Sequence, residues 1–80
     1  MKEEITQALH KILSIMHFLS AIDAENAVHV DDIAKHVQSL DKSQIEDVLR
    51  CCKELGYVGE RSGRFYLTFK GILSAISISS

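Results

Sequence analysis

The chain has 80 residues, of which 46% are hydrophobic and 25% are charged, and its formal net charge is -2. This length fits a single domain, and the composition excludes an intrinsically disordered chain. No apolar run reaches the roughly 18–20 residues that span a membrane, and the acidic start is unlike a secretory signal. The two cysteines are adjacent, which excludes a disulfide framework. We therefore expect a small cytoplasmic binding module without a membrane contact.

Charge is divided unevenly between the two halves of the chain. Residues 1–34 include two basic and six acidic residues, whereas residues 35–80 include seven basic and five acidic residues. Any polyanion should therefore contact the second half. The basic excess is small, however, since nucleic-acid-binding domains are usually far more basic.

Apolar residues at helical spacing predict a first helix over about residues 3–22. They form two neighbouring stripes, one made of Ile5, Leu9, Ile12, Met16 and Leu19 and the other of Ala8, Ile15, Phe18 and Ile22. One stripe is enough to cover a small core. The second stripe indicates that this helix is buried on another side as well, and a second copy of the chain is the partner that we expect.

The following stretch contains a break and a short helix. Residues 23–27 interrupt the helical period and should form a loop, and the β-branched segment 28–30 predicts one short edge strand. The side chain of Asp31 can accept hydrogen bonds from the first amides of a helix. We therefore expect Asp31 to cap a helix that ends near Gln38.

A further helix over residues 42–55 has strong signals at both ends. Asp41 is a favoured N-cap residue, and Gln44 follows at the spacing of a capping box. Gly56 suits the left-handed conformation that ends many helices. Because the preceding helix ends only a few residues earlier, the two helices should cross and leave the polar face of residues 42–55 exposed.

The last third of the chain predicts a hairpin and a final helix. Residues 57–60 and 64–68 favour strands and flank the glycine-containing turn 61–63. Residues 69–78 are apolar and serine-rich, and we expect a helix there, although residues 76–79 also alternate like a strand.

The order of these elements, helix, strand, helix, helix, hairpin and helix, resembles that of a winged helix-turn-helix domain. Two passages are also similar to that family. Its helix-turn-helix is similar to the apolar pattern made by Ile33-Ala34, Val37, Ile45, Val48-Leu49 and Leu55-Gly56-Tyr57-Val58. Tyr66-Leu67-Thr68-Phe69-Lys70-Gly71 resembles the passage from the wing to the last helix in MarR-like and related archaeal and bacterial regulators. The matched passages lie between about Val28 and Gly71, which is more than half of the chain.

The resemblance implies one winged-helix domain over residues 1–80, mainly α with a small β-hairpin wing, in the order α-β-α-α-β-β-α. In such a domain the helix-turn-helix covers about residues 31–55, the wing about residues 57–68 and the C-terminal helix about residues 69–78. The resemblance also implies a transcriptional regulator that binds double-stranded DNA. One helix then enters the major groove, and the wing contacts the adjacent backbone or minor groove.

Carried over position by position, the resemblance places seven residues at DNA, namely Lys42, Ser43, Gln44 and Arg50 on the helix and Arg61, Ser62 and Arg64 on the wing. Glutamine can read adenine, arginine can read guanine, and hydroxyl groups can hold phosphates. Glu46 and Asp47 depart from the family pattern, because two carboxylates on this helix repel a phosphate-lined groove. A second hypothesis is therefore a winged-helix protein-protein interaction module that binds a protein partner and no DNA.

The apolar surplus of the chain predicts a homodimer. The doubled stripe of the first helix and the apolar residues 72–76 exceed what an 80-residue core can enclose. Such a surplus is typical of a symmetric interface, and two-fold regulators bind half-sites about one helical turn apart. The expected interface residues are Ile15, Phe18, Ile22, Leu73 and Ile76.

A third hypothesis is a metal or redox sensor. The partners in each histidine pair, His10 with His17 and His29 with His36, lie seven positions apart. Seven residues are roughly 10 Å along a helix, which is too far for two ligands of one ion. Cys52 lies on the apolar helix face with Cys51 at its margin, so we expect inert thiols. No spacing places a base beside a nucleophile, and we expect no enzyme, no cofactor and no metal.

Overall fold

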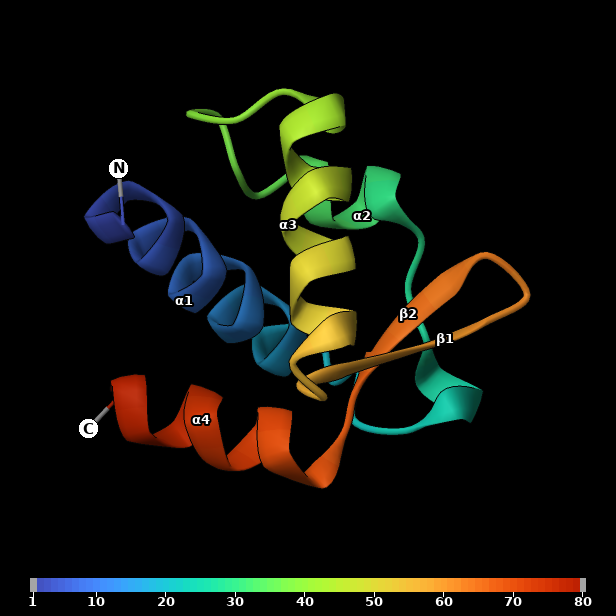
Figure 1. Ribbon diagram of the computed structural model, residues 1–80. Coiled ribbons are helices and arrows are strands. Elements are labelled where there is room, and N and C mark those ends of the chain that lie inside the picture. Colours follow the sequence, from blue (N-terminus) through green and yellow to red (C-terminus); the bar gives the residue numbers. More distant parts are fainter. Residues whose placement is uncertain (1, 80) are drawn as a thin grey trace.

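The computed structural model describes residues 2–79 of the chain and the side chains of residues 6–77. Its elements in chain order are α1 (Lys2–Phe18), the short 3-10 helix η1 (Ala24–Asn26), α2 (Val30–Ala34), α3 (Lys42–Glu54), β1 (Val58–Arg61), β2 (Arg64–Leu67) and α4 (Phe69–Ser79). The two strands form an antiparallel hairpin in which Val58 pairs with Leu67 and Arg61 with Arg64. The expected mainly helical fold with a small β-hairpin is confirmed (Figure 1).

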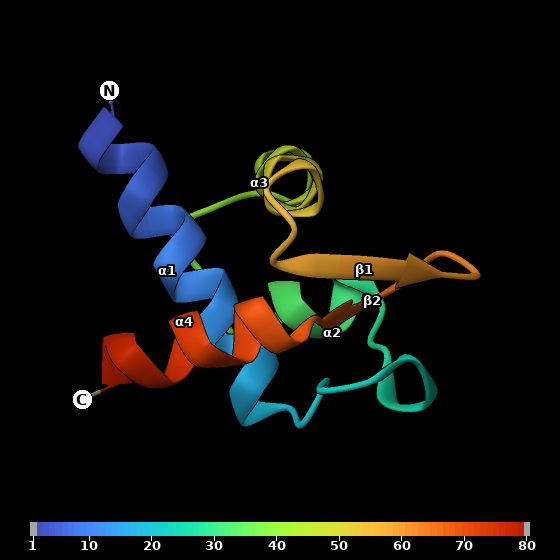
Figure 2. The same cartoon turned by 60° about the horizontal axis from the view of Figure 1, so that its bottom comes forward.

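The helices and the hairpin pack together, since α1 and α4 both contact β2 and α3 contacts β1. α1 packs against both α4 and α3, and α2 packs against α3. The hairpin extends away from this helical body, and both ends of the described chain lie on the side remote from its tip (Figures 1 and 2). No helix within residues 2–79 combines the length and the apolar composition that crossing a membrane requires.

The core gathers apolar side chains from the helices and from the hairpin. Its largest fully buried members are Ile12, Leu13 and Met16 of α1, Ile33 of α2, Ile45, Leu49 and Cys52 of α3, and Leu67 of β2. Burial of each aliphatic side chain of this size contributes roughly 1.5–3 kcal/mol relative to its exposure. The apolar periods that predict α1 and α3 therefore identify the faces with which these helices meet the core.

Helix α1 ends earlier than the sequence predicts. It stops at Phe18 and does not reach residue 22, because Ser20 adopts a left-handed conformation with a φ of 61°. The first two amides beyond Leu19 donate to carbonyls of the last helical turn, in the pattern of a Schellman C-cap. Ala21 is fully buried after this turn and accepts a 2.7 Å hydrogen bond from the Leu67 amide. This contact with the hairpin overrides the apolar helical period, which continues to residue 22 in the sequence.

The short strand predicted at residues 28–30 is wrong except at its first residue. Val28 and Phe65 exchange two backbone hydrogen bonds of 2.8 Å, which form an isolated bridge beside the hairpin. The chain already turns into α2 two residues later, so the bridge does not extend into a strand. The bridge nevertheless ties the segment before α2 to the hairpin.

Helix α2 differs from the prediction at both ends. Its N-cap is His29 and not Asp31, because the helix already begins at the buried Val30. The His29 Nδ1 atom accepts from the Asp31 amide at 3.2 Å, and the Asp32 carboxylate accepts from the His29 amide at 3.3 Å. The helix ends at Ala34, before the predicted end near residue 38. The carboxylate of Asp31 is therefore not used for capping and contacts α3 instead.

The predicted N-cap and end of α3 are confirmed. The Asp41 carboxylate accepts from the Gln44 amide at 2.8 Å, and the Gln44 side-chain oxygen accepts from the Asp41 amide at 2.9 Å. Gly56 follows the helix with a φ of 83°. In the hairpin, Ser62 and Gly63 form the turn with left-handed φ values of 53° and 78°. The predicted turn over residues 61–63 is one residue too long, because Arg61 belongs to β1.

Helix α4 is confirmed, and its first turn is attached to the end of α3. Thr68 Oγ1 accepts from the Gly71 amide at 3.2 Å and donates to the Gly56 carbonyl at 2.6 Å. Lys70 Nζ donates to the Leu55 carbonyl at 2.8 Å. These bonds satisfy amides at the start of one helix and carbonyls at the end of another. We call the attachment, residues 55–57 with 68–71, the α3–α4 junction.

Close backbone contact at the α3–α4 junction depends on Gly71. A Cβ atom at this position would collide with the carbonyl oxygen of Tyr57. The ring of Tyr57 in turn lies 4.8 Å from Lys70 Nζ, which is a favourable cation–π distance. The passage 66–71, which carries part of the family resemblance, therefore has a structural role in this fold.

Candidate nucleic-acid interface

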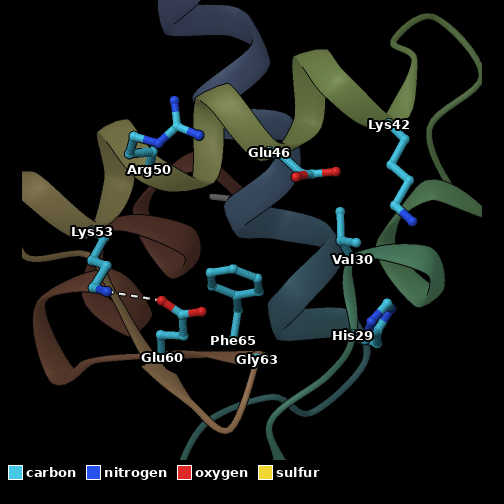
Figure 3. A pocket seen from close by; sticks show the side chains of 9 residues that line it. All are labelled: His29, Val30, Lys42, Glu46, Arg50, Lys53, Glu60, Gly63 and Phe65. Carbon is cyan, nitrogen blue, oxygen red and sulfur yellow. Dashed lines mark hydrogen bonds and ion pairs between the residues drawn. The ribbon is translucent and has the colours of Figure 1, made fainter.

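An open groove of about 430 Å³ separates α3 from the hairpin (Figure 3). We call it the α3–hairpin groove. Helix α3 contributes Lys42, Glu46, Arg50 and Lys53 to its lining, and the other elements contribute His29, Val30, Glu60, Gly63 and Phe65. The four residues of α3 recur at helical spacing, so one polar face of the helix borders the groove. Figure 3 shows the ring of Phe65 standing between the hairpin and α3.

Both α3 lysines in the groove are paired with carboxylates of neighbouring elements. Lys42 Nζ lies 3.1 Å from Asp31 Oδ1 of α2, and Lys53 Nζ lies 2.8 Å from Glu60 Oε1 of β1. The hydrogen bond from Lys42 lowers the pKa of Asp31 below its ordinary value of 3.8. All four side chains retain solvent contact, so these pairs are individually weak and can exchange for other partners.

Arg50 also has a carboxylate partner, within its own helix. Its Nη1 atom lies 3.2 Å from Oδ1 of Asp47, one turn earlier. Glu46 borders the groove near the middle of the helix and takes no part in the ion pairs found among residues 6–77. The cations of the α3 polar face are thus matched by acidic groups around them. This face has little net attraction for a polyanion as it stands.

Two of the predicted α3 contacts lie outside the groove. The side-chain oxygen of Gln44 is bonded to the Asp41 amide, so bidentate reading of an adenine requires that the capping box opens. Ser43 is exposed on the first turn of the helix. The structure therefore brings Lys42 and Arg50 together along the groove and separates Ser43 and Gln44 from it.

The hairpin tip presents the other predicted residues, Arg61, Ser62 and Arg64, all of them exposed. The two arginines are directly opposed across the strands, one on each side of the turn. Within the part of the chain whose side chains are described, no ion pair involves either arginine. Both guanidinium groups are therefore available to an external anion, in contrast to the lysines of α3.

Six residues that line the groove are absent from the site that the sequence predicts: His29, Val30, Lys53, Glu60, Gly63 and Phe65. Lys53 follows Arg50 by three positions and shares its helix face, so helical spacing already contained this signal. The positions of Glu60 and Phe65 follow only from the strand register, in which these two residues are paired. His29 enters the site because α2 begins at Val30, which the sequence does not reveal.

The five residues expected at a dimer interface lie on α1, on the turn after it and on α4. Phe18 is 74% exposed, and Ile22, Leu73 and Ile76 are 45–50% exposed. Ile15 is partly buried and packs against the core of its own chain. Two further large apolar side chains are exposed and were not predicted, namely Leu55 and Phe69. Helices α1 and α4 pack against each other, and Phe18 lies at the end of α1, where its ring meets that of His36 edge-on with the ring centroids 5.8 Å apart.

The cysteines lie on the core side of α3. Cys52 is fully buried, and burial raises the pKa of its thiol to about 12. Cys51 is partly buried, and both thiols are unbridged. Among the side chains of residues 6–77, no group of three or more histidine, cysteine or acidic residues is arranged to hold a metal ion.

Comparison with known proteins adds no family assignment. No family model, no curated protein and no solved structure matches the chain. The features that bear on function are therefore the geometry of the groove and of the hairpin tip.

Proposed function

We propose that this protein is a winged helix-turn-helix regulator of transcription that binds double-stranded DNA. In this proposal α2 and α3 form the helix-turn-helix and the hairpin is the wing. The observation that supports it best is the position of two exposed arginines, Arg61 and Arg64, at the tip of the hairpin that walls the α3 groove. Unpaired guanidinium groups at such a tip suit phosphate contacts beside a helix that reads the major groove.

The dimensions of α3 support the proposal. Its 13 residues give a length of about 20 Å at 1.5 Å per residue, and an α-helix fits the major groove of B-DNA. Lys42 and Ser43 stand on its exposed first turn, from which recognition helices usually contact base edges. Arg50 extends the same polar face by two further turns and offers a donor for guanine or for a phosphate.

Duplex binding measured by fluorescence anisotropy at two salt concentrations tests this proposal. We expect a mixed-sequence duplex to bind at low salt and to be released as salt rises, because phosphate contacts expel counterions from DNA. The double variant Arg61→Ala/Arg64→Ala should lose about 1.8 from the slope of log affinity against log salt, at about 0.9 for each phosphate contact.

Lys11→Ala is the matched control for the wing variant. Lys11 is an exposed cation on α1, away from the groove, so its loss should leave the slope nearly unchanged. A wild-type protein that fails to bind at low salt contradicts the proposal, and so does an equal loss of slope in the wing variant and in the control.

We also propose that the protein acts as a homodimer that joins exposed apolar residues of α1 and α4. Phe18 is the better test position, because Ile15 packs against its own core and Ile15→Asp endangers the fold. Sedimentation should show a dimer for the wild type and a folded monomer for Phe18→Asp. A wild type that is monomeric at high concentration contradicts the dimer.

The alternative function is a winged-helix module that binds a protein partner and no DNA. It is favoured by the balance of charges on α3, where Glu46 and Asp47 accompany the cations. Under this alternative, the salt titration gives no duplex binding at any salt concentration, and the same α3 face then becomes the first surface to search for a protein partner.

A further inference from the structure

Two ion pairs, one at each end of the α3 polar face, join α3 to neighbouring elements of the fold. Lys42 and Asp31 come from α3 and α2, and Lys53 and Glu60 come from α3 and β1. Both carboxylates therefore belong to elements that stand beside the proposed recognition helix. Figure 3 shows the carboxylate of Glu60 turned toward Lys53 from the hairpin side of the groove.

Carboxylates in these positions compete with phosphates for the same donors. A lysine ammonium group binds either kind of oxygen anion by charge and by its N–H donors. The lysine side chains are about half exposed, at 55% and 52%, so a phosphate can reach them if the carboxylate gives way. The cost of that exchange removes most of the attraction that these lysines would otherwise have for any duplex.

The arginines of the hairpin tip have no such competitor among the described side chains. Phosphate attraction at the tip is independent of sequence, because every duplex carries the same backbone. On α3, by contrast, a duplex must replace two ion pairs before it gains the lysines. Base edges that donate hydrogen bonds to the released carboxylates and accept hydrogen bonds from the lysines offset the loss of the ion pairs. Base sequences without such groups do not offset it.

We propose that Asp31 and Glu60 are specificity-determining residues, which mask Lys42 and Lys53 from phosphates and so restrict tight binding to favourable base sequences. This inference rests on the proposed DNA-binding function. Its direct consequence is counterintuitive for residues beside a binding face. Neutralising either carboxylate strengthens binding to a mixed-sequence duplex and weakens discrimination between sequences.

The test uses Asp31→Asn and Glu60→Gln, singly and together, in the full chain. Each single variant should tighten binding to a mixed-sequence duplex by about two- to fivefold at low salt, which is the range of an exposed ion pair. The double variant should steepen the salt slope by up to about 1.8, at about 0.9 for each lysine released to a phosphate. In selections from random duplexes, the double variant should enrich its preferred sequences less strongly than the wild type does.

A matched control separates masking from a general gain of positive charge. Glu25→Gln/Glu54→Gln has the same net charge as the double variant, and both residues are exposed and lie outside the groove. The gain from Glu60→Gln should also vanish when Lys53→Gln is present, because no cation is then left to release. A general charge effect persists in that background. Thermal unfolding of every variant confirms that the compared proteins are folded.

The outcomes separate this inference from the function on which it rests. If the wild type binds DNA but the two carboxylate variants gain no more than the control, masking is wrong and the DNA-binding proposal stands. If neither the wild type nor any variant binds at low salt, the DNA-binding function is wrong and the inference falls with it. A gain that requires Lys53 and reduces sequence enrichment supports masking.

Discussion

The α3–α4 junction and the α3–hairpin groove involve the same helix but are held by different kinds of contact. At the junction, Thr68 and Lys70 satisfy backbone groups of two helix ends, and Gly71 permits close backbone contact. Along the groove, partly exposed side chains form ion pairs that can exchange with solvent or with a ligand. The junction therefore fixes the fold, whereas the groove retains polar groups that a partner can recruit.

This difference changes the weight of the family resemblance. The passage 66–71 carries part of the winged-helix resemblance expected from the sequence, and its residues lie at the α3–α4 junction and in the core. A resemblance in this passage therefore concerns residues that stabilise the fold and not residues that would contact DNA. The residues that bear on the proposed DNA binding lie in the groove, where acidic groups balance the cations, and at the hairpin tip, where Arg61 and Arg64 have no ion-pair partner among the described side chains.

The largest effect that we predict is the loss of stability in Gly71→Ala. Alanine normally stabilises a helix relative to glycine, but here its Cβ atom collides with the Tyr57 carbonyl oxygen. We expect a destabilisation of about 3 kcal/mol, as for other overpacked sites, measured by urea unfolding. Gly63→Ala is the control, because its turn has open space and only its left-handed φ of 78° opposes alanine. Equal losses in the two variants would refute the close contact.

A smaller loss is expected for Thr68→Val. Valine preserves the shape of the side chain but leaves the Gly71 amide and the Gly56 carbonyl without their hydroxyl partner. Loss of such a helix cap costs about 1–2 kcal/mol in unfolding free energy. Ser43→Ala removes an exposed hydroxyl from the first turn of α3 and should change stability by less than about 0.5 kcal/mol. A Thr68→Val variant as stable as the wild type would contradict the capping role.

The core face of α3 predicts a dependence on alkaline pH. Burial raises the pKa of Cys52 from 9.0 to about 12, so the folded state keeps the thiol protonated where the unfolded state loses the proton. The contribution of the protonated Cys52 thiol to the free energy of unfolding is complete below pH 9.0 and is lost as the pH rises toward 12. Unfolding measured across this range should show the loss in the wild type and a smaller loss in Cys52→Ala. In the native protein, alkylating agents should modify Cys51 before Cys52.

The smallest stability effects are expected in the groove. Glu60→Gln removes a partly exposed ion pair and should cost less than about 1 kcal/mol, and less again at about 1 M salt, where the screening length falls to about 3 Å. Lys42 lowers the pKa of Asp31, so the stability from that pair is present above the ordinary pKa of 3.8 and is lost as the pH falls below it. If Glu60→Gln lowers the free energy of unfolding as much as Gly71→Ala does, the proposed difference between the groove and the α3–α4 junction is wrong.

The sequence predicts those parts of the fold that depend on local signals. The capping box of Asp41 and Gln44, the end of α3 at Gly56 and the hairpin all follow from residues close together in the chain. The errors arise where distant segments decide. The bond between Ala21 and Leu67 accompanies the early end of α1, and the bridge of Val28 to Phe65 precedes the start of α2.

The candidate site was predicted less completely for the same reason. The basic residues of α3 and of the hairpin can be read from the sequence, but their partners cannot. Asp31 contacts Lys42 in a structure in which His29 caps α2, and Glu60 contacts Lys53 because the hairpin packs beside α3. The charge balance of the groove is therefore a property of the tertiary structure.

The salt slope of wild-type duplex binding tests the account most directly. With the α3 lysines masked and the hairpin arginines exposed, each protomer contributes about two phosphate contacts, and the slope of log affinity against log salt is about -1.8 for a monomer and about -3.6 for a dimer. A slope in this range that falls toward zero in Arg61→Ala/Arg64→Ala is the predicted result. A failure to bind at low salt, or a slope that these two substitutions leave unchanged, would contradict the account.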